Sequence, residues 1–269
     1  CWRDMQEGIV ETSLTYDEQF EQVLGYADTR LEIEDGEQGS PSWLQSRVGY
    51  CTGSRFKDVM DFLKKGGEGA RRAAYRMELL VERLVGKPVD HFVNAAMEHG
   101  TEMEPLARMA YESRTGCMVL QPGFTHHQTI AWVGGSCDGM VGEDGIIEIK
   151  CPNSGTHINT LLNGMSDDHK PQVLGYLWIT GRKWADFISY DPRMPEGLQL
   201  YVQRIPRDDD YIAELAGNVL KFLSEVEELH TRLMALTKAA PPAPSIVPLA
   251  HDVQVGAAPE SDAAQVPIS

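Results

Sequence analysis

The sequence lacks any uninterrupted run of about eighteen apolar residues, although hydrophobic residues make up 42% of its 269 positions. A helix that crosses a bilayer needs roughly twenty such residues, so we expect no membrane span. The first residues also lack the basic and then apolar pattern of a secretory signal. Both absences favour a protein that stays in the cytoplasm.

Cysteine is scarce, and its spacing gives no sign of metal binding. The five cysteines are odd in number and include no C-x-x-C pair: Cys1, Cys51, Cys117, Cys137 and Cys151. A disulfide framework needs an even set, and zinc or iron–sulfur sites need thiols at short, regular spacing. We therefore expect reduced thiols in a reducing compartment.

Positive charge is also in short supply. The 24 Lys and Arg residues face 40 Asp and Glu residues, and the formal net charge of −16 usually counts against nucleic-acid binding. The charge is uneven, however, because residues 47–87 hold ten Lys or Arg against five acids. Such a segment fits either a surface for a polyanion or the solvated face of a helix. Charge alone favours the second interpretation.

The order of helix and strand patterns predicts an α/β fold with a mixed β-sheet flanked by helices. Helical spacing occurs at residues 15–27, 42–47, 54–65, 69–86, 91–114, 170–181 and 208–237. Strand patterns occur at residues 117–124, 129–141, 145–150, 184–192 and 198–206. We interpret residues 1–39 as an acidic extension, 40–237 as the folded domain, and 238–269 as a disordered tail rich in Ala and Pro.

The stretch GGSCDGMVGEDGIIEIKCP places two acids and a lysine around a glycine-rich turn. If residues 143–145 form a three-residue hairpin loop with its glycine in the left-handed conformation, Asp138 lies opposite Lys150. Because side chains alternate along a strand, Asp138, Glu148 and Lys150 then share one face, and the intervening isoleucines point into the core. A loop of even length would split the three residues across two faces.

Two carboxylates on one face repel each other unless a cation or a proton lies between them. Their oxygen atoms suit a hard cation such as Mg²⁺ or Mn²⁺. A neighbouring lysine can orient a water molecule, so the set is equipped for metal-assisted hydrolysis of a phosphodiester. The alternative is an exposed hairpin with ordinary charges, and a D-x₉-E-x-K pattern alone does not exclude it.

Further motifs follow in a fixed order around this turn. SWLQSRVGYCTGS, HGTEMEPLA and GGSCDG precede EIKCP, PQVLGYLWITG and YDPRMPEGLQLYV. From Ser40 to Leu236 the series resembles the lambda-exonuclease, or YqaJ-type, viral recombinase family of PD-(D/E)xK nucleases. The resemblance implies a restriction-endonuclease-like core and makes residues 40–237 the expected exonuclease domain.

The resemblance also implies a metal centre. Its catalytic set comprises one lysine, three acids and one glutamine: Lys150, Glu148, Asp138, Glu104 and Gln172. Mg²⁺, or Mn²⁺ in its place, would be held by the three acids and the backbone carbonyl of Ile149, with two ions expected per site. Without the resemblance, Glu104 and Gln172 would be interpreted as exposed helix residues.

Three further residues match the positions at which this family binds a 5′-terminal phosphate. Arg47 offers a planar fork of donors, and Ser54 adds a hydroxyl at a helix start. Ser136 would complete the pocket beside Asp138. A plain N-cap is the alternative role for Ser54, and the two roles are compatible.

The sequence departs from the family pattern in places. Cys137 replaces the proline before the aspartate, and Thr156 replaces an arginine that contacts the DNA backbone. Four cations of the basic segment are candidates for duplex contacts: Lys64, Lys65, Arg71 and Arg72.

The resemblance implies a Mg²⁺-dependent exonuclease that degrades the 5′ strand of duplex DNA and leaves 3′ overhangs for phage-type recombination. It also implies a ring-shaped homotrimer, a single-strand annealing protein as partner, and a phage or prophage gene expressed in a bacterial cytoplasm. Two alternatives stay open. One is a RecB/Cas4-like nuclease of other polarity, and the other is a non-catalytic scaffold that binds DNA ends for recombination.

Overall fold

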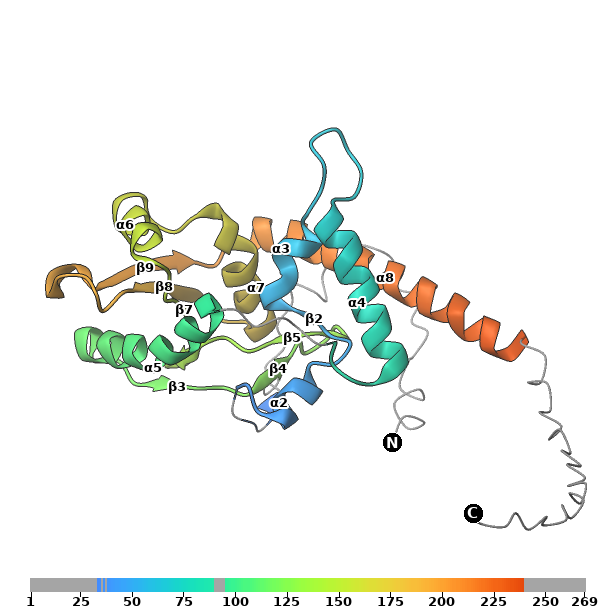
Figure 1. Ribbon diagram of the computed structural model, residues 1–269, viewed down its shortest axis with the longest axis horizontal. Coiled ribbons are helices and arrows are strands. Elements are labelled where there is room, and N and C mark those ends of the chain that lie inside the picture. The colour runs from blue at the N-terminus through green and yellow to red at the C-terminus, as the bar shows by residue number, and fades with distance from the viewer. Residues whose placement is uncertain (1–32, 35, 37, 90–94, 240–269) are drawn as a thin grey trace, which may run out of the picture.

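The computed structural model describes residues 33–34, 36, 38–89 and 95–239 (Figure 1). The helix expected at residues 15–27 lies outside this part of the chain, and so does the tail expected at residues 238–269 from residue 240 onward. None of the described helices is long and apolar enough to cross a membrane.

In the described part of the chain, five strands form the main sheet. Their order is β3 (Val119–Leu120), β6 (Gly139–Val141), β7 (Gly145–Lys150), β8 (Trp184–Tyr190) and β9 (Leu200–Pro206). β7 and β8 run parallel, and the other pairs are antiparallel. A parallel pair needs a long crossover, which here contains α6 (Ser154–Asn163) and α7 (Lys170–Thr180). The predicted α/β fold with a mixed, helix-flanked sheet is confirmed.

Each face of β7 packs against a different layer of helices. Ile147 belongs to a buried cluster with residues of α5 (Ala95–Thr115). Ile146 belongs to a second cluster with α7 and α8 (Asp209–Ala239), in which Trp178 is fully buried. The central strand is therefore fixed from both sides, as its nearly continuous apolar sequence predicts.

The hairpin between β6 and β7 differs from the prediction by one residue on each strand. Val141 pairs with Gly145, so the loop is 142–144, and Gly142 rather than Gly145 has the positive φ, of 54°. Gly145 instead lies against the indole of Trp184, which an added Cβ would approach to 2.1 Å. The predicted loop was wrong. Because both strands shift by one residue, the alternation of faces is preserved.

A second sheet of the described residues has four strands. Their order is β1 (Ile33–Glu34), β4 (Phe124–His126), β5 (Val133–Gly135) and β2 (Cys51–Thr52). β2 and β5 are parallel, with Thr52 paired to Gly134. Parallel strands end at the same edge of a sheet. This brings the residues that follow them, Ser54 in the 3₁₀ turn η1 (Gly53–Arg55) and Ser136, to one side.

Two predicted helices have the expected ends. α2 (Pro41–Ser46) begins at Ser40, whose hydroxyl accepts a hydrogen bond from the backbone N–H of Trp43 at 3.2 Å. α4 (Ala70–Val85) ends at Gly86 in the left-handed conformation, as a C-terminal glycine predicts.

Two other predictions about helices were wrong. The helix expected at residues 54–65 is limited to α3 (Phe56–Val59), because the carbonyl oxygen of Asp61 accepts from the backbone N–H of Gly69 and closes a loop there. α6 was not anticipated, although Asn153 caps it by accepting from the backbone N–H of Thr156 at 2.9 Å.

The basic segment serves mainly to hold helices together. Arg72 is 3% exposed and binds Glu225 of α8 at 2.7 Å, and Arg71 pairs with Asp61 at 3.0 Å. Arg72 was therefore wrongly proposed as a duplex contact, because its charge is consumed in a buried ion pair. Lys64 and Lys65 are exposed on the loop that projects between α3 and α4 (Figure 1).

Candidate functional site

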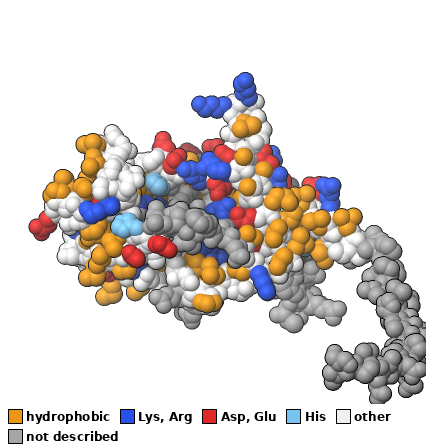
Figure 2. Space-filling view, in the orientation of Figure 1, with side chains coloured by type: hydrophobic (Ala, Val, Ile, Leu, Met, Phe, Trp, Pro, Cys, Tyr) orange, Lys and Arg blue, Asp and Glu red, His pale blue; other side chains and the backbone are white. Residues whose placement is uncertain are grey.

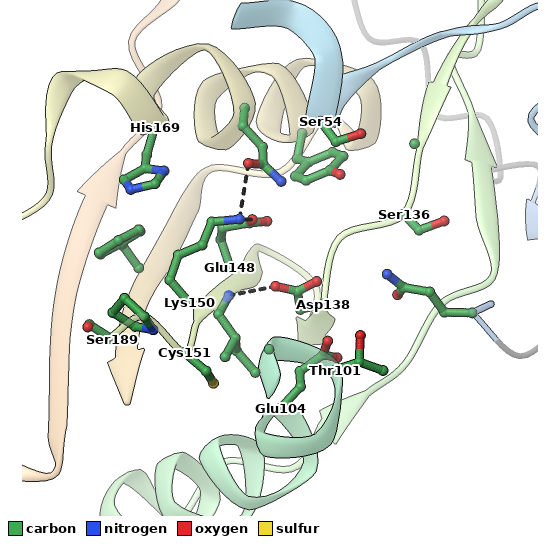
Figure 3. Close-up of a pocket in the computed structure, with 18 of the residues that line it drawn as sticks. Ser54, Thr101, Glu104, Ser136, Asp138, Glu148, Lys150, Cys151, His169 and Ser189 are labelled. Carbon is green, nitrogen blue, oxygen red and sulfur yellow. Dashed lines mark hydrogen bonds and ion pairs between the residues drawn. The ribbon is translucent and has the colours of Figure 1, made fainter. Parts of the chain in front are cut away.

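A cavity of about 540 Å³ lies where the two sheets meet α2, α5 and α7. All nine residues predicted for the site line it: Arg47, Ser54, Glu104, Ser136, Asp138, Glu148, Ile149, Lys150 and Gln172. They come from six separate segments of the chain, which the fold brings to one place. Figure 3 shows that the side chains of Asp138, Glu148, Lys150 and Glu104 surround a common space.

Asp138 is held across the hairpin by the backbone of β7. Its Oδ2 accepts a hydrogen bond from the N–H of Ile149 at 2.6 Å, which fixes the carboxylate beside the strand that carries Glu148 and Lys150. Burial raises the pKa of Asp138, while Lys150 and the N–H of Ile149 oppose that shift. The bond explains how Asp138, outside β6, still joins the face predicted for it.

Glu148 and Lys150 lie two residues apart on one face of β7. Lys150 Nζ is 2.7 Å from Glu148 Oε1, and it donates a hydrogen bond to Gln172 Oε1 of α7 at 3.2 Å (Figure 3). Burial alone would lower the pKa of Lys150, but the carboxylates of Glu148 and Asp138 raise it. Lys150 is therefore a permanent cation in the site at neutral pH.

The carboxyl groups destabilise one another's charged forms. Burial, followed by repulsion from Asp138, raises the pKa of Glu148 to about 8 and that of Glu104 to about 7. Glu148 is 1% exposed. Lys150 and Arg108 supply two positive charges against the three carboxylates, so the site favours binding an extra proton or an extra cation.

The donors in this cavity fit a divalent metal. Both side-chain oxygens of Glu148 are buried; Oε1 faces Lys150 Nζ at 2.7 Å, and Oε2 has no hydrogen-bond partner among the described residues. A buried carboxylate oxygen without a partner is costly unless a cation binds it. Among the described residues, no group of three or more His, Cys, Asp or Glu side chains is placed to hold a metal ion as it stands. The oxygen atoms in the cavity that suit a hard cation belong to Asp138, Glu148, Glu104 and the Ile149 carbonyl.

Glu104 extends into the cavity from α5, and its position depends on a residue that the sequence prediction missed. Arg108, one turn later, donates to Glu104 Oε1 at 2.6 Å. The i, i+4 spacing of an acid and an arginine could have indicated this pair. It leaves the second oxygen of Glu104 available to the cavity.

The three residues predicted to bind a phosphate line the same cavity, and Ser136 is two residues from Asp138. The guanidinium of Arg47 is 4.1 Å from the ring centroid of Trp43, and Trp43 Nε1 donates to Ser136 Oγ at 2.8 Å. Ser54 Oγ lies 3.3 Å from the hydroxyl of Thr52. Trp43 therefore positions two of the three residues, and nothing in the sequence indicated this role.

Arg47 is the cation of this group. Burial lowers the pKa of its guanidinium. Among the described residues it makes no ion pair, whereas neighbouring Arg55 is bound to Asp58 at 2.6 Å and to Glu78 at 2.8 Å. A half-buried guanidinium with two hydroxyls nearby is a site for an anion such as a phosphate group.

The residues that depart from the family pattern also lie here. Cys137 is buried, and its Sγ lies 3.5 Å from the carbonyl oxygen of Gly139, so it packs behind Asp138 rather than facing the cavity. Thr156 lines the cavity at the start of α6, together with Thr160 of the same face. A hydroxyl thus replaces a cation at that point.

Comparisons with known proteins identify the family of the chain. Residues 42–183 match the family model for the YqaJ-like viral recombinase domain. An alkaline exonuclease from Laribacter hongkongensis, also solved in complex with dAMP, has 42% identity and a TM-score of 0.69. The match covers 75% of this chain and 100% of that one.

A phage-related exonuclease from Haemophilus somnus 129PT matches with 17% identity and a TM-score of 0.52, over 70% of this chain and 96% of that one. This second likeness shows the fold alone. A search of curated proteins gave no significant match. The family match, the identity to the Laribacter enzyme and the shared fold lead to one conclusion: the chain belongs to the YqaJ-like viral recombinase domain family.

Proposed function

We propose that this protein is a Mg²⁺-dependent exonuclease that degrades the 5′ strand of duplex DNA from 5′-phosphorylated ends. It would leave 3′ overhangs for phage-type recombination. Family membership and the likeness to the Laribacter exonuclease support deoxyribonuclease activity. The observation that carries the finer proposal is the layout of the cavity. The residues of the carboxylate–lysine cluster and of the arginine–serine pocket line one and the same cavity, which supports the proposal.

The acids and the lysine supply the hydrolytic half of the cavity. Asp138, Glu148, the Ile149 carbonyl and Glu104 would hold Mg²⁺, two ions being expected by analogy with related sites. When bound, the metal would polarise the phosphodiester and lower the pKa of the attacking water. Lys150 uses two of its three N–H donors on Glu148 and Gln172, so the third can orient that water.

The arginine and the serines supply the end-recognition half. Arg47, held over Trp43, would bind the terminal phosphate, and the hydroxyls of Ser54 and Ser136 would donate to its remaining oxygens. Anchoring the phosphate sets which phosphodiester reaches Lys150. This is a positioning effect, and it gives the enzyme its preference for a 5′-phosphoryl end.

A decisive assay uses a linear duplex with a different dye on the 3′ end of each strand, in 5′-phosphorylated and 5′-hydroxyl forms. We expect Mg²⁺-dependent release of mononucleotides from the 5′ ends, and at least a hundredfold loss in Lys150→Ala, as expected for a catalytic group. Lys183→Ala is the matched control, because Lys183 is 72% exposed and lies outside the cavity.

The outcomes separate the alternatives. Release from 3′ ends would refute the polarity and favour a RecB/Cas4-like activity. Tight binding of DNA ends with no release of nucleotides in Mg²⁺ or Mn²⁺ would refute catalysis and favour a non-catalytic scaffold. Equal rates on 5′-phosphorylated and 5′-hydroxyl ends would refute only the phosphate pocket and not the exonuclease activity.

Assembly is the remaining part of the proposal. A homotrimer that encloses DNA, working with a single-strand annealing protein, would give processive resection and deliver the overhang to its partner. The net charge of −16 is compatible with this if the cations line an inner channel. Light scattering on the purified chain tests the trimer directly, and a monomer that still resects DNA would refute it.

A further inference from the structure

The outward face of α4 is apolar along its whole length. Its exposed large side chains are Met77 at 52%, Val81 at 43%, Leu84 at 42% and Val85 at 61%. Ala74, about one turn before Met77, and Ala70, about two turns before it, are also exposed. Figure 2 shows hydrophobic side chains gathered over the lower part of α4. We call these six residues the α4 stripe.

The spacing of the α4 stripe is that of a helix–helix seam. Residues 70, 74, 77, 81 and 84 follow intervals of four and three, which place apolar side chains at the a and d positions of a heptad. The opposite face of α4 is already used, since Tyr75, Leu79 and Leu80 are buried in the core. A helix with apolar residues on both faces is expected to pack on two sides.

The chain contains a segment with the matching pattern. Residues 15–27 repeat apolar side chains at Tyr16, Phe20, Val23 and Ala27, again at intervals of four and three. The segment holds three acids and no Lys or Arg. It lies outside the described residues, so its sequence, its charge and its distance from α4 are the features that bear on docking.

The linker between residues 15–27 and the described part of the chain is short. Six residue steps join Ala27 to Ile33, where β1 begins, and can span up to about 20 Å. β1 is two strands from β5, or about 10 Å. The residue before β5, Trp132, contacts Arg83 on the buried face of α4, with the guanidinium 4.4 Å from the indole centroid. The linker from residues 15–27 therefore leads to a sheet that packs against the lower half of α4.

Charge also favours this pairing. Lys87, just beyond the C-terminal end of the stripe, is exposed, and Arg71 at the other end is 54% exposed although it is ion-paired with Asp61. An acidic amphipathic helix would lie between cations, whereas a second copy of α4 would bring like charges together in a parallel arrangement.

We propose that residues 15–27 fold back as an amphipathic helix on the α4 stripe of the same chain, covering Met77 and Val81. This goes beyond the proposed function and does not depend on it. It gives the acidic extension a structural role as an intramolecular cover, one that keeps an apolar face away from other molecules.

Met77 is a built-in reporter of this cover, because methionine oxidation by peroxide follows solvent exposure. Peptide mass spectrometry of the full chain gives the oxidation rate of Met77 beside those of Met109 and Met118. These are 63% and 77% exposed elsewhere on the molecule. We compare the unaltered chain with Phe20→Asp, which places a charge in the seam. Gln19→Asp is the matched control, because it adds the same charge one residue away, off the seam.

We expect Phe20→Asp to speed Met77 oxidation about fivefold, which corresponds to a segment docked roughly four-fifths of the time. Gln19→Asp should leave the Met77 rate unchanged, and Met109 and Met118 should keep their rates in both variants. Equal Met77 rates in all three chains would overturn the proposal. So would protection of Met77 that rises with protein concentration and survives Phe20→Asp, because that result assigns the stripe to a second copy.

Discussion

Glu148 is predicted to weaken the metal-free fold, so replacing it by glutamine should stabilise the protein while abolishing activity. The carboxyl group is 1% exposed, and its pKa is raised from 4.5 to about 8 by burial and by Asp138. At 1.36 kcal/mol per pKa unit, this shift corresponds to a loss of about 5 kcal/mol in the free energy of unfolding by pH 8. Relaxation and water penetration reduce such figures, so we expect a gain of about 1–3 kcal/mol for Glu148→Gln.

The sign follows from proton linkage. A carboxyl group with a raised pKa keeps its proton in the folded state after the unfolded chain has lost it. Its contribution is therefore favourable below about pH 4.5 and is lost as the pH rises to about 8. The amide introduced by Glu148→Gln does not titrate, so the advantage of this variant should be near zero at pH 4.5 and reach its full size at pH 8.

Urea unfolding in EDTA between pH 4.5 and 8 measures this difference. Glu102→Gln is the control, because Glu102 is exposed on the same helix as Glu104 and should show no pH-dependent advantage. Adding Mg²⁺ should raise the unfolding midpoint of the unaltered chain by mass action, and that of Glu148→Gln much less. A Glu148→Gln chain that is less stable at pH 8 would show that the carboxylate is a net stabilising partner of Lys150, and would refute the reasoning.

Three further predictions concern the pocket and the fold. Arg47→Ala should reduce the preference for 5′-phosphorylated over 5′-hydroxyl ends by about 1.5–3 kcal/mol, or roughly 10–100-fold, in kcat/KM; an unchanged ratio contradicts the phosphate pocket. Asp191→Asn should cost about 2 kcal/mol, because Asp191 accepts hydrogen bonds from Ser154 at 2.7 Å and from Arg193. The pKa of Asp191 is lowered to about 2. In urea unfolding, the cost of Asp191→Asn should therefore be present above pH 4 and disappear toward pH 2. A cost that does not change with pH contradicts the assignment. Gly175→Ala should destabilise the fold by about 1–3 kcal/mol despite the better helix propensity of alanine, since its Cβ would meet Phe56 at 2.3 Å. Gly100→Ala in α5 meets nothing within 4 Å and should be neutral or stabilising in the same thermal-unfolding assay.

Local sequence patterns predicted the elements that depend on short-range signals. Ser40-Pro41 and Gly86 marked helix ends, because caps and left-handed glycines act on neighbouring backbone groups. The helix expected at residues 54–65 failed for the opposite reason. Its local propensity was overridden when Asp61 closed a loop with Gly69.

The metal cluster could be predicted from the alternation of one hairpin even though the loop was misplaced. Moving both strands of the pair by one residue keeps Asp138 on the same face as Glu148 and Lys150, so an error in register did not become an error in the site. The assignment of Glu104 and Gln172 had no such local support. It came from the order of motifs along the chain, since an acid and an amide on helices carry no signal of their own.

The sequence by itself determined the class of fold, the family, and the residues available for chemistry, because these follow from periodicity and from ordered motifs. The tertiary structure decided which of those residues meet. Parallel pairing of β2 with β5 places Ser54 beside Ser136, and Trp43 joins Arg47 to Ser136. Burial then sets the charge states, because the pKa of Glu148 depends on desolvation and on Asp138, ten residues away in the chain. Neither the contacts between these residues nor their burial can be inferred from how far apart they are in the sequence.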